Sequence, residues 1–214
     1  KGAEAFNRPV DILEVSSAIT LESMFEGAIS FDSEITGWQV GATENMSSMF
    51  KNTSRFGLNG LLYNISSWDV ANVTTMASMF ENSTLFNADL GSWTTGNVTT
   101  MQAMFKGAST FNFSIGFWPT TALGNTVEMF KNATSFDQDL SSWYIGQLTD
   151  ADEMFDGSGL STTNYDALLN GWAAQAPAIQ SNVKLGAQGI QYTIGTSQTA
   201  HDILTSPPYN WTIA

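Results

Sequence analysis

Few side chains in this chain of 214 residues have the types and spacing that catalysis or metal binding needs. There is no Cys and one His, which excludes thiolate nucleophiles, disulfides and multi-histidine metal sites. The single imidazole, His201, precedes Asp202 in an expected helix, where adjacent positions do not face each other. We therefore predict no His–Asp catalytic pair. No Gly-rich phosphate loop and no nucleophile elbow occurs either.

Carboxylates close together in sequence are the second source of chemistry, at Asp137/Asp139 and at Asp150/Asp152/Glu153. Oxygen clusters suit Ca²⁺, but the Asp-x-Asp-x-Asp-Gly loop is absent, so solvated or capping roles are predicted. A sugar-active enzyme with carboxylates roughly 5–10 Å apart is the weakest of three functional hypotheses. We predict a non-enzymatic protein with no catalytic residue, no cofactor and no metal site.

Nine Asn-x-Ser/Thr sequons could accept N-glycans, where composition would give roughly three by chance. The alternative is that repeat geometry places Asn and Thr at these positions without glycosylation. Asn45 and Asn112 are expected to be the least accessible. The predicted acceptors are Asn52, Asn64, Asn72, Asn82, Asn97, Asn132 and Asn210.

Side chains that flank a recurring Trp are the candidate ligand-binding residues, since alternation along a strand would leave them exposed. Phe117 and Tyr144 could stack on a sugar or a peptide. The alternative is ordinary variation at solvent-facing positions. The predicted ligand face comprises Gln39, Asp69, Thr94, Phe117 and Tyr144.

Charge and composition limit the partners. Lys and Arg total 7 against 20 Asp and Glu, and the net charge of −13 opposes binding to nucleic acid or to anionic membrane surfaces. No apolar run approaches the roughly 20 residues that span a bilayer, so no direct membrane insertion is expected. Only 13% of residues are charged, and the 14 Phe and 7 Trp provide ample material for a core.

A repeat positions these side chains. Met-Phe pairs occur at Met24-Phe25 and then at steps of 25, 30, 25, 25 and 25 residues, ending at Met154-Phe155. A period of this length indicates stacked units that share one core. The long third unit has five extra residues near 57–62. The six units are 1–25, 26–50, 51–80, 81–105, 106–130 and 131–155.

Each column of the repeat predicts a structural role. The alternation from Trp to the next residue but one predicts a short strand. The Met-Phe segment predicts a short helix, with Thr, Asn or Asp as N-cap four residues before the Met and Gly or Asn in the left-handed conformation after it. We therefore predict a right-handed solenoid like that of leucine-rich repeats, with a parallel sheet on one face and short helices on the other. Phe6, Phe31, Phe56, Phe86, Phe111 and Phe136 form one core column, and Trp38, Trp68, Trp93, Trp118 and Trp143 another.

The two ends of the array carry separate expectations. Lys1-Gly2-Ala3 matches the Lys-Gly-Ala that follows a Met-Phe pair at 106–108, so we expect the array to continue upstream. Residues 156–214 are expected to form an α/β cap, with helices over 162–174 and 197–204 and strands over 183–185, 190–194 and 209–213. A charge column after each Met-Phe is interpreted as a register device. It reads Lys1, Glu26, Lys51, Glu81, Lys106, Lys131 and Asp156.

The unit at 86–105 resembles the 25–26-residue repeat of BspA-like leucine-rich-repeat surface proteins. The tail also resembles the end of that family, at 160–169, Gly171-Trp172 and Trp211-Thr212-Ile213. The pattern departs at Leu13, which replaces Trp, and at Pro119, which interrupts the fifth strand. The resemblance implies an extracellular or surface-anchored protein with adhesion or matrix-binding roles, and it carries over no catalytic residues.

The leading hypothesis is therefore an extracellular or cell-surface repeat protein that binds a protein or glycan through one face of the array. The alternative is a structural subunit that self-assembles into an extracellular coat or filament.

Overall fold

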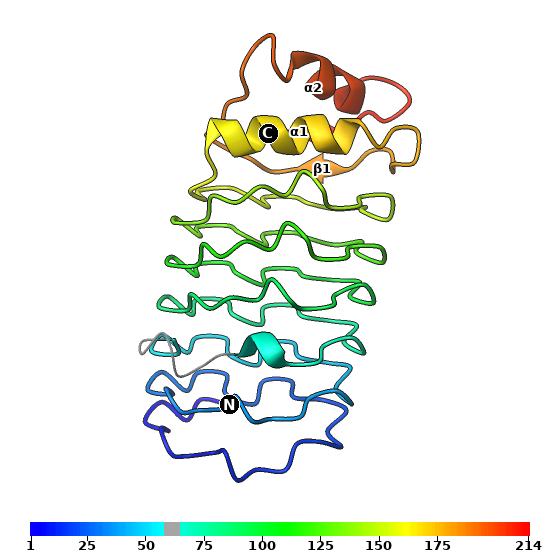
Figure 1. Cartoon of the computed structure of the whole chain (residues 1–214). Helices are drawn as coiled ribbons and strands as arrows, with labels where there is room; N and C mark the ends of the chain where they lie inside the picture. Colours follow the sequence, from blue (N-terminus) through cyan, green and yellow to red (C-terminus); the bar gives the residue numbers. More distant parts are fainter. Residues whose placement is uncertain (58–64) are drawn as a thin grey trace.

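The computed structural model describes residues 1–57 and 65–214. The repeat region is a stack of irregular coils, and the C-terminal helices lie across the last coil (Figure 1). The predicted insertion in the third unit falls mostly outside the described residues. Within them the regular elements are η1 (Ile65–Ser67), α1 (Thr162–Ala173), β1 (Lys184–Leu185), α2 (Gln198–Thr205) and β2 (Thr212–Ile213).

The predicted leucine-rich-repeat-like solenoid, with a parallel sheet on one face and short helices on the other, is wrong. The sheet that the described residues form has two strands, β1 and β2, and both lie in the C-terminal segment. Between the described coils there are isolated parallel bridges instead of strands, for example Thr20↔Asn45 and Asn45↔Thr75. Both described α-helices also lie after the repeats.

A left-handed residue inside each Met-Phe segment explains why no helix forms there. Ser23 has φ of 55° and Glu128 has φ of 55°, whereas an α-helix needs uninterrupted right-handed residues. Equivalent values occur at Ser48, Ser78, Ala103 and Glu153. The predicted left-handed Gly and Asn positions are confirmed, for example Gly27 at 72° and Asn52 at 60°. They are corners of successive turns and do not end a helix.

Backbone hydrogen bonds between coils replace those of a helix. The N–H groups of residues 21, 23, 25 and 27 donate to the carbonyls of residues 45, 47, 49 and 51 of the next coil. The same four bonds recur at each later junction up to the sixth coil, at 2.7–3.1 Å. Intervening N–H groups close tight turns, as from Met24 to the Leu21 carbonyl. A helix of about seven residues is too short to be stable alone, so the neighbouring coil is the better partner.

The first coil contains carbonyls that correspond to the acceptors of this ladder. Among the described residues, none donates a hydrogen bond to the carbonyls of Thr20, Glu22 and Met24. These groups are equivalent to the acceptors at Asn45, Ser47 and Met49 in the second coil. The following carbonyl, that of Glu26, accepts from the Gly2 N–H at 2.6 Å.

The predicted strands around each Trp are also wrong, although the predicted burial is confirmed. Trp38 and Val40 are buried while Gln39 between them is exposed. The coils are joined here by side chains: each indole N–H donates to a carbonyl of the preceding coil, as from Trp93 to Ile65 at 2.9 Å. Because the strand is absent, Pro119 interrupts no ladder, and its carbonyl accepts the Thr95 hydroxyl at 2.8 Å.

Stacked aromatic rings fill the core, as the columns predicted. Phe80, at the end of the third unit, and Phe86 of the fourth stack with centroids 3.9 Å apart, and the Phe residues of successive Met-Phe pairs, such as Phe80 and Phe105, stack at 5.6 Å. The Trp rings form a parallel column, with Trp93 and Trp118 at 6.2 Å. No single coil could bury these rings, so the stack is their shared interior.

A ladder of Asn and Asp side chains joins the coils beside the Phe column. The Asn112 side-chain oxygen accepts the Asp137 N–H at 2.8 Å, and Asp137 in turn accepts the Ser161 N–H at 2.8 Å. Asn7 and Asn87 do the same for the coils that follow them. This ladder was not predicted, although the recurring Phe-Asn and Phe-Asp pairs were its signal in the sequence.

The C-terminal segment extends the same interactions. Helix α1 begins after Ser161, whose side chain caps the helix by accepting the Asn164 N–H. Trp172 of α1 is fully buried and donates its indole N–H to Leu140, which adds one more rung to the Trp ladder. Residues 190–194 form no strand, contrary to prediction. Strand β1 bridges Ala151 of the last coil and pairs with β2.

We predict that Trp93→Phe lowers the free energy of unfolding by about 2–3 kcal/mol, measured by calorimetry. The substitution removes the donor to the Ile65 carbonyl and leaves that buried acceptor unsatisfied. Phe117→Ser is the control, because its ring is 90% exposed and should change stability by less than about 0.5 kcal/mol. Equal effects of the two variants would contradict the role given to the indole ladder.

Candidate binding face

The predicted ligand residues lie beside the buried Trp column, on a surface that we call the front face. Gln39, Asp69, Thr94, Phe117 and Tyr144 are all exposed. Because coils stack in register, Gln39, Asp69, Thr94 and Tyr144, which each follow a Trp, form one row along the stack. Phe117 precedes its Trp and lies in the neighbouring row, so the structure does not gather the five residues into a single pocket.

The lower part of the row contains a polar hollow of about 280 Å³ between the second and third coils. Gln39 and Asp69 line it together with Thr36, Ser67 and the edge of Trp38. One Asp69 oxygen accepts the Ala71 N–H at 3.1 Å. The indole of Trp38 is buried and donates to Val10, so it offers no ring for stacking.

The upper part of the front face carries exposed aromatic rings. Phe117 is 90% exposed, Tyr144 is 41% exposed and Phe113 is 38% exposed. The Tyr144 hydroxyl lies against Gly146, where any Cβ would collide with it, so this ring is fixed along the surface. Thr94 lies one coil before Phe117 and adds a hydroxyl.

Phe117 occupies a position where other repeats have Gly or Ser. The hydroxyls of Ser92 and Ser142 donate to carbonyls of the coils that precede them, at 2.7 and 2.6 Å. Phe117 has no such group, and its ring projects into solvent. The fifth coil therefore lacks the hydrogen bond that Ser forms at this position in neighbouring coils, and it has an exposed ring there instead.

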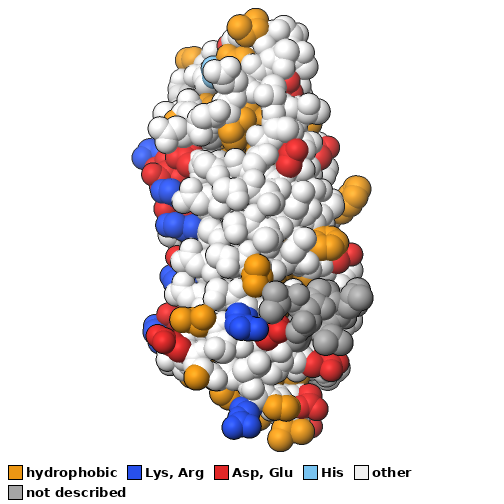
Figure 2. Space-filling model, turned by 90° about the vertical axis from the view of Figure 1, so that its left-hand side faces the viewer, with side chains coloured by type: hydrophobic (Ala, Val, Ile, Leu, Met, Phe, Trp, Pro, Cys, Tyr) orange, Lys and Arg blue, Asp and Glu red, His pale blue; other side chains and the backbone are white. Residues whose placement is uncertain are grey.

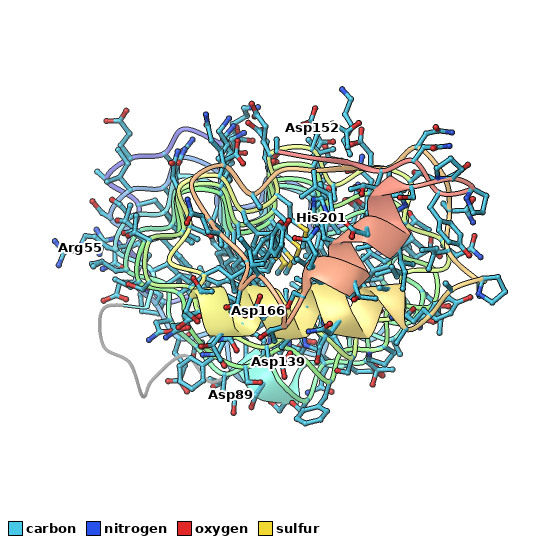
Figure 3. All side chains as sticks on the ribbon, turned by 90° about the horizontal axis from the view of Figure 1, so that it is seen from above. Arg55, Asp89, Asp139, Asp152, Asp166 and His201 are labelled. Carbon is cyan, nitrogen blue, oxygen red and sulfur yellow. The ribbon has the colours of Figure 1, made fainter. Side chains whose placement is uncertain are left out.

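Two carboxylates lie in the coils on either side of the coil that contains Phe117. Asp89 belongs to the preceding coil and Asp139 to the following one, and Figure 3 shows both on the same side of the molecule. Each fixes a turn, because one oxygen accepts the N–H two residues on, at Gly91 and Ser141, both at 2.8 Å. Neither forms an ion pair within the described residues.

The lysine side chains gather on the opposite edge of the stack. Lys1 pairs with Glu26 at 3.1 Å, Lys51 with Glu81 at 2.7 Å, and Lys106 with Glu128 at 2.6 Å. Lys131 pairs with Glu128 and Glu153, and Lys184 with Asp152. In Figure 3 Asp152 lies on the far side from Asp89 and Asp139, and Figure 2 shows the charged stripe along one edge. The predicted register column is therefore confirmed at its first four members, while Lys106 and Lys131 use Glu128 of the turn.

The pKa values along this edge reflect the pairing. The hydrogen bond from Lys106 lowers the pKa of Glu128, against the opposing effect of burial, and Lys131 contributes further. The hydrogen bonds that the Lys131 ammonium donates to Glu153 and then to Glu128 raise its pKa. At the front, burial opposes ionisation of Asp137, but the bonds from Ser161 and Asn164 outweigh it and lower the pKa.

The other chemistry-bearing residues act as structural groups. Asp137 anchors α1, Asp139 fixes a turn, and Asp150 accepts the Asp152 N–H at 3.1 Å. His201 and Asp202 approach to 3.4 Å, so the expectation that they do not face each other is wrong. The His201 ring stacks on Tyr192 with centroids 4.8 Å apart. Within 1–57 and 65–214, no group of three His, Cys, Asp or Glu side chains could hold a metal ion.

The predicted glycan acceptors divide into two groups. Asn72 and Asn97 donate their amides to the carbonyls of Gly41 and Ala71, and Asn82 donates to Asn52. Asn132 and Asn210 are exposed, and their side chains form no hydrogen bond within the described part of the chain. Asn64 lies outside the described residues. The repeat geometry thus accounts for Asn72, Asn82 and Asn97, and glycosylation remains a prediction.

Comparison with known proteins gives a family. The family described as "Mycoplasma protein of unknown function, DUF285" matches residues 1–66 and 58–172. The chain belongs to this family. Together the two matches extend over all six repeats and reach Trp172, the last rung of the Trp ladder. Searches of curated proteins and of solved structures found no significant match.

The family match supports a repeat protein, and its description assigns no function. The helices that the structure describes are all too short or too polar to cross a membrane.

We predict that Glu128→Gln lowers the free energy of unfolding by about 0.5–1 kcal/mol at pH 7, because it breaks contacts to two lysines on a partly exposed edge. The folded pKa lies below the ordinary value of 4.5, so the contribution is present above pH 4.5 and is lost as pH falls through the folded pKa. Urea unfolding of both proteins across pH measures this. Glu14→Gln, at an exposed site without an ion pair in the described residues, is the control. A difference that persists at low pH would contradict the assignment.

Proposed function

We propose that the protein is a non-enzymatic extracellular or cell-surface binding protein that holds a protein or glycan on its front face. The resemblance to BspA-like surface proteins supports the surface location and an adhesive role. The many Ser, Thr and Asn side chains and the low content of charged residues, 13%, also fit a surface or secreted protein.

The observation that carries the proposal is the exposure of Phe117. A ring that is 90% exposed stabilises nothing in the fold, and it replaces a residue type that forms hydrogen bonds in neighbouring repeats. Exposed aromatic residues on a rigid scaffold are typical anchors of binding surfaces. The backbone beside it is held in place, because the Gly116 carbonyl accepts from Ser142 and the Trp118 indole donates to Leu90. Little conformational freedom is therefore lost when a partner binds.

We expect the monomeric protein to bind at least one component of an array of glycans and extracellular proteins, and Phe117→Ser to weaken that binding about ten-fold or more. The unfolding temperature should not change, because the ring is exposed. The matched control is Ile194→Ser, which removes an apolar side chain that is 84% exposed outside the front face. Equal effects of the two variants, or no binding by the monomer, would contradict the proposal.

The alternative is a structural subunit that self-assembles into an extracellular coat or filament. Sedimentation velocity over a range of concentrations separates the two functions. Polymers that form without ligand would support the subunit, whereas a monomer at all concentrations supports the binding protein.

A further inference from the structure

The partner of the upper front face can be inferred from how charge is distributed over the molecule. All five Lys side chains form ion pairs with Glu or Asp on the edge opposite Asp89 and Asp139. The two Arg residues lie elsewhere: Arg8 is in the first coil, and Arg55 projects from a lateral edge in Figure 3. The surface around Phe117 in the fourth to sixth coils therefore has carboxylates and no basic residue.

The two carboxylates lie in the coils directly before and after that of Phe117, at the repeat position that Ser114 occupies in the fifth coil. Gly116, which precedes Phe117, packs so tightly on the Asp139 backbone that a Cβ would collide with the Asp139 carbonyl. On the other side, a Cβ at Gly91 would contact both an Asp89 carboxylate oxygen, at 3.2 Å, and the Ser114 carbonyl, at 3.3 Å. Asp89 thus borders the fifth coil, and Asp139 borders it from the other side. At about 4.8 Å per coil, the two carboxylates are separated by roughly 10 Å.

The turns fix the orientation of both carboxylates, so that each can contact a cation. In each, one oxygen is fixed by the turn N–H, which limits rotation of the side chain. The remaining oxygen faces solvent, since both residues are exposed. The exposed face of the Phe117 ring between them attracts cations through its quadrupole. An acidic or phosphate-bearing partner would be repelled here, and the net charge of −13 strengthens that effect.

We propose that this part of the front face binds an extended, basic segment of another protein, with Lys or Arg side chains at Asp89 and Asp139 and one of these cations in contact with the Phe117 ring. This inference rests on the proposed function and names its partner class. An extended or polyproline-type segment advances about 3.1–3.4 Å per residue. Basic residues three positions apart therefore match the separation of the two carboxylates. The Tyr144 ring extends the apolar contact along the segment.

The experiment uses a fluorescent peptide of four Lys-Gly-Gly triplets, with Gln-Gly-Gly and Glu-Gly-Gly peptides as its counterparts. Fluorescence anisotropy at low salt should show that the basic peptide binds the wild-type chain and that the other two do not. The double variant Asp89→Asn/Asp139→Asn should weaken binding about ten-fold, and Phe117→Leu several-fold, because it keeps an apolar side chain but removes the ring. Binding should weaken as salt is raised.

The matched control is Glu4→Gln/Glu14→Gln, which removes the same two charges from exposed positions of the first coil. It should keep the wild-type affinity within about two-fold. Equal weakening by the two double variants would mean general charge attraction and would overturn the proposal, as would equal binding of the Gln-Gly-Gly peptide. If a glycan or neutral protein on the array binds with sensitivity to Phe117→Ser but not to Asp89→Asn/Asp139→Asn, the proposed function stands and this inference fails.

Discussion

Every second backbone N–H in the turn segment of a repeat takes its carbonyl partner from the next coil. Buried backbone groups must be paired, and an isolated seven-residue segment offers too few internal partners. The neighbouring coil solves this at four positions per junction, and the remaining N–H groups close turns within the coil. The left-handed residues, the stacked rings and the side-chain ladders all follow from this arrangement, because each requires coils in register.

The core could be read from the sequence, while the backbone conformation could not. The spacing of Met, Phe and Trp identified the stacked columns and the buried residues, since periodicity reports which side chains face inward. The left-handed Gly and Asn corners were also predicted, because these residues tolerate positive φ. The other left-handed residue of each repeat lies four positions before the Gly or Asn, and it is Ser, Ala or Glu, which do not favour positive φ. A short helix was therefore predicted where consecutive turns form. The strand prediction failed for a similar reason, because alternating burial does not require backbone pairing.

The candidate site was predicted in part. The exposed residues beside the Trp column were identified from alternation, including Phe117 and Tyr144. The role of Asp89 was missed, and Asp139 was considered only as half of an acidic pair, because nothing in a single repeat shows what the next coil brings beside it. The same limit applies to Lys106, whose predicted partner was in its own column and whose observed partner is Glu128. Contacts between coils depend on side-chain reach, which spacing alone does not specify.

The lysine ion pairs of the described residues lie on one edge of the molecule, away from the front face. Lysines and their partners lie along one edge, where they add to the register that the backbone ladder sets. The front face retains carboxylates without basic neighbours. A chain with few charged residues thus has two edges of different electrostatic character, and surface changes on one edge need not disturb the other.

The backbone ladder between the coils gives the stack a direction. N–H groups of the turn segments point toward the C-terminal end and their acceptors toward the N-terminal end, so the ladder behaves as a vector. After the sixth coil, Ala151 and Phe155 donate to the carbonyls of Lys184 and Gly186. The C-terminal segment thus supplies the acceptors that a further coil would supply, and it continues the same hydrogen-bond direction.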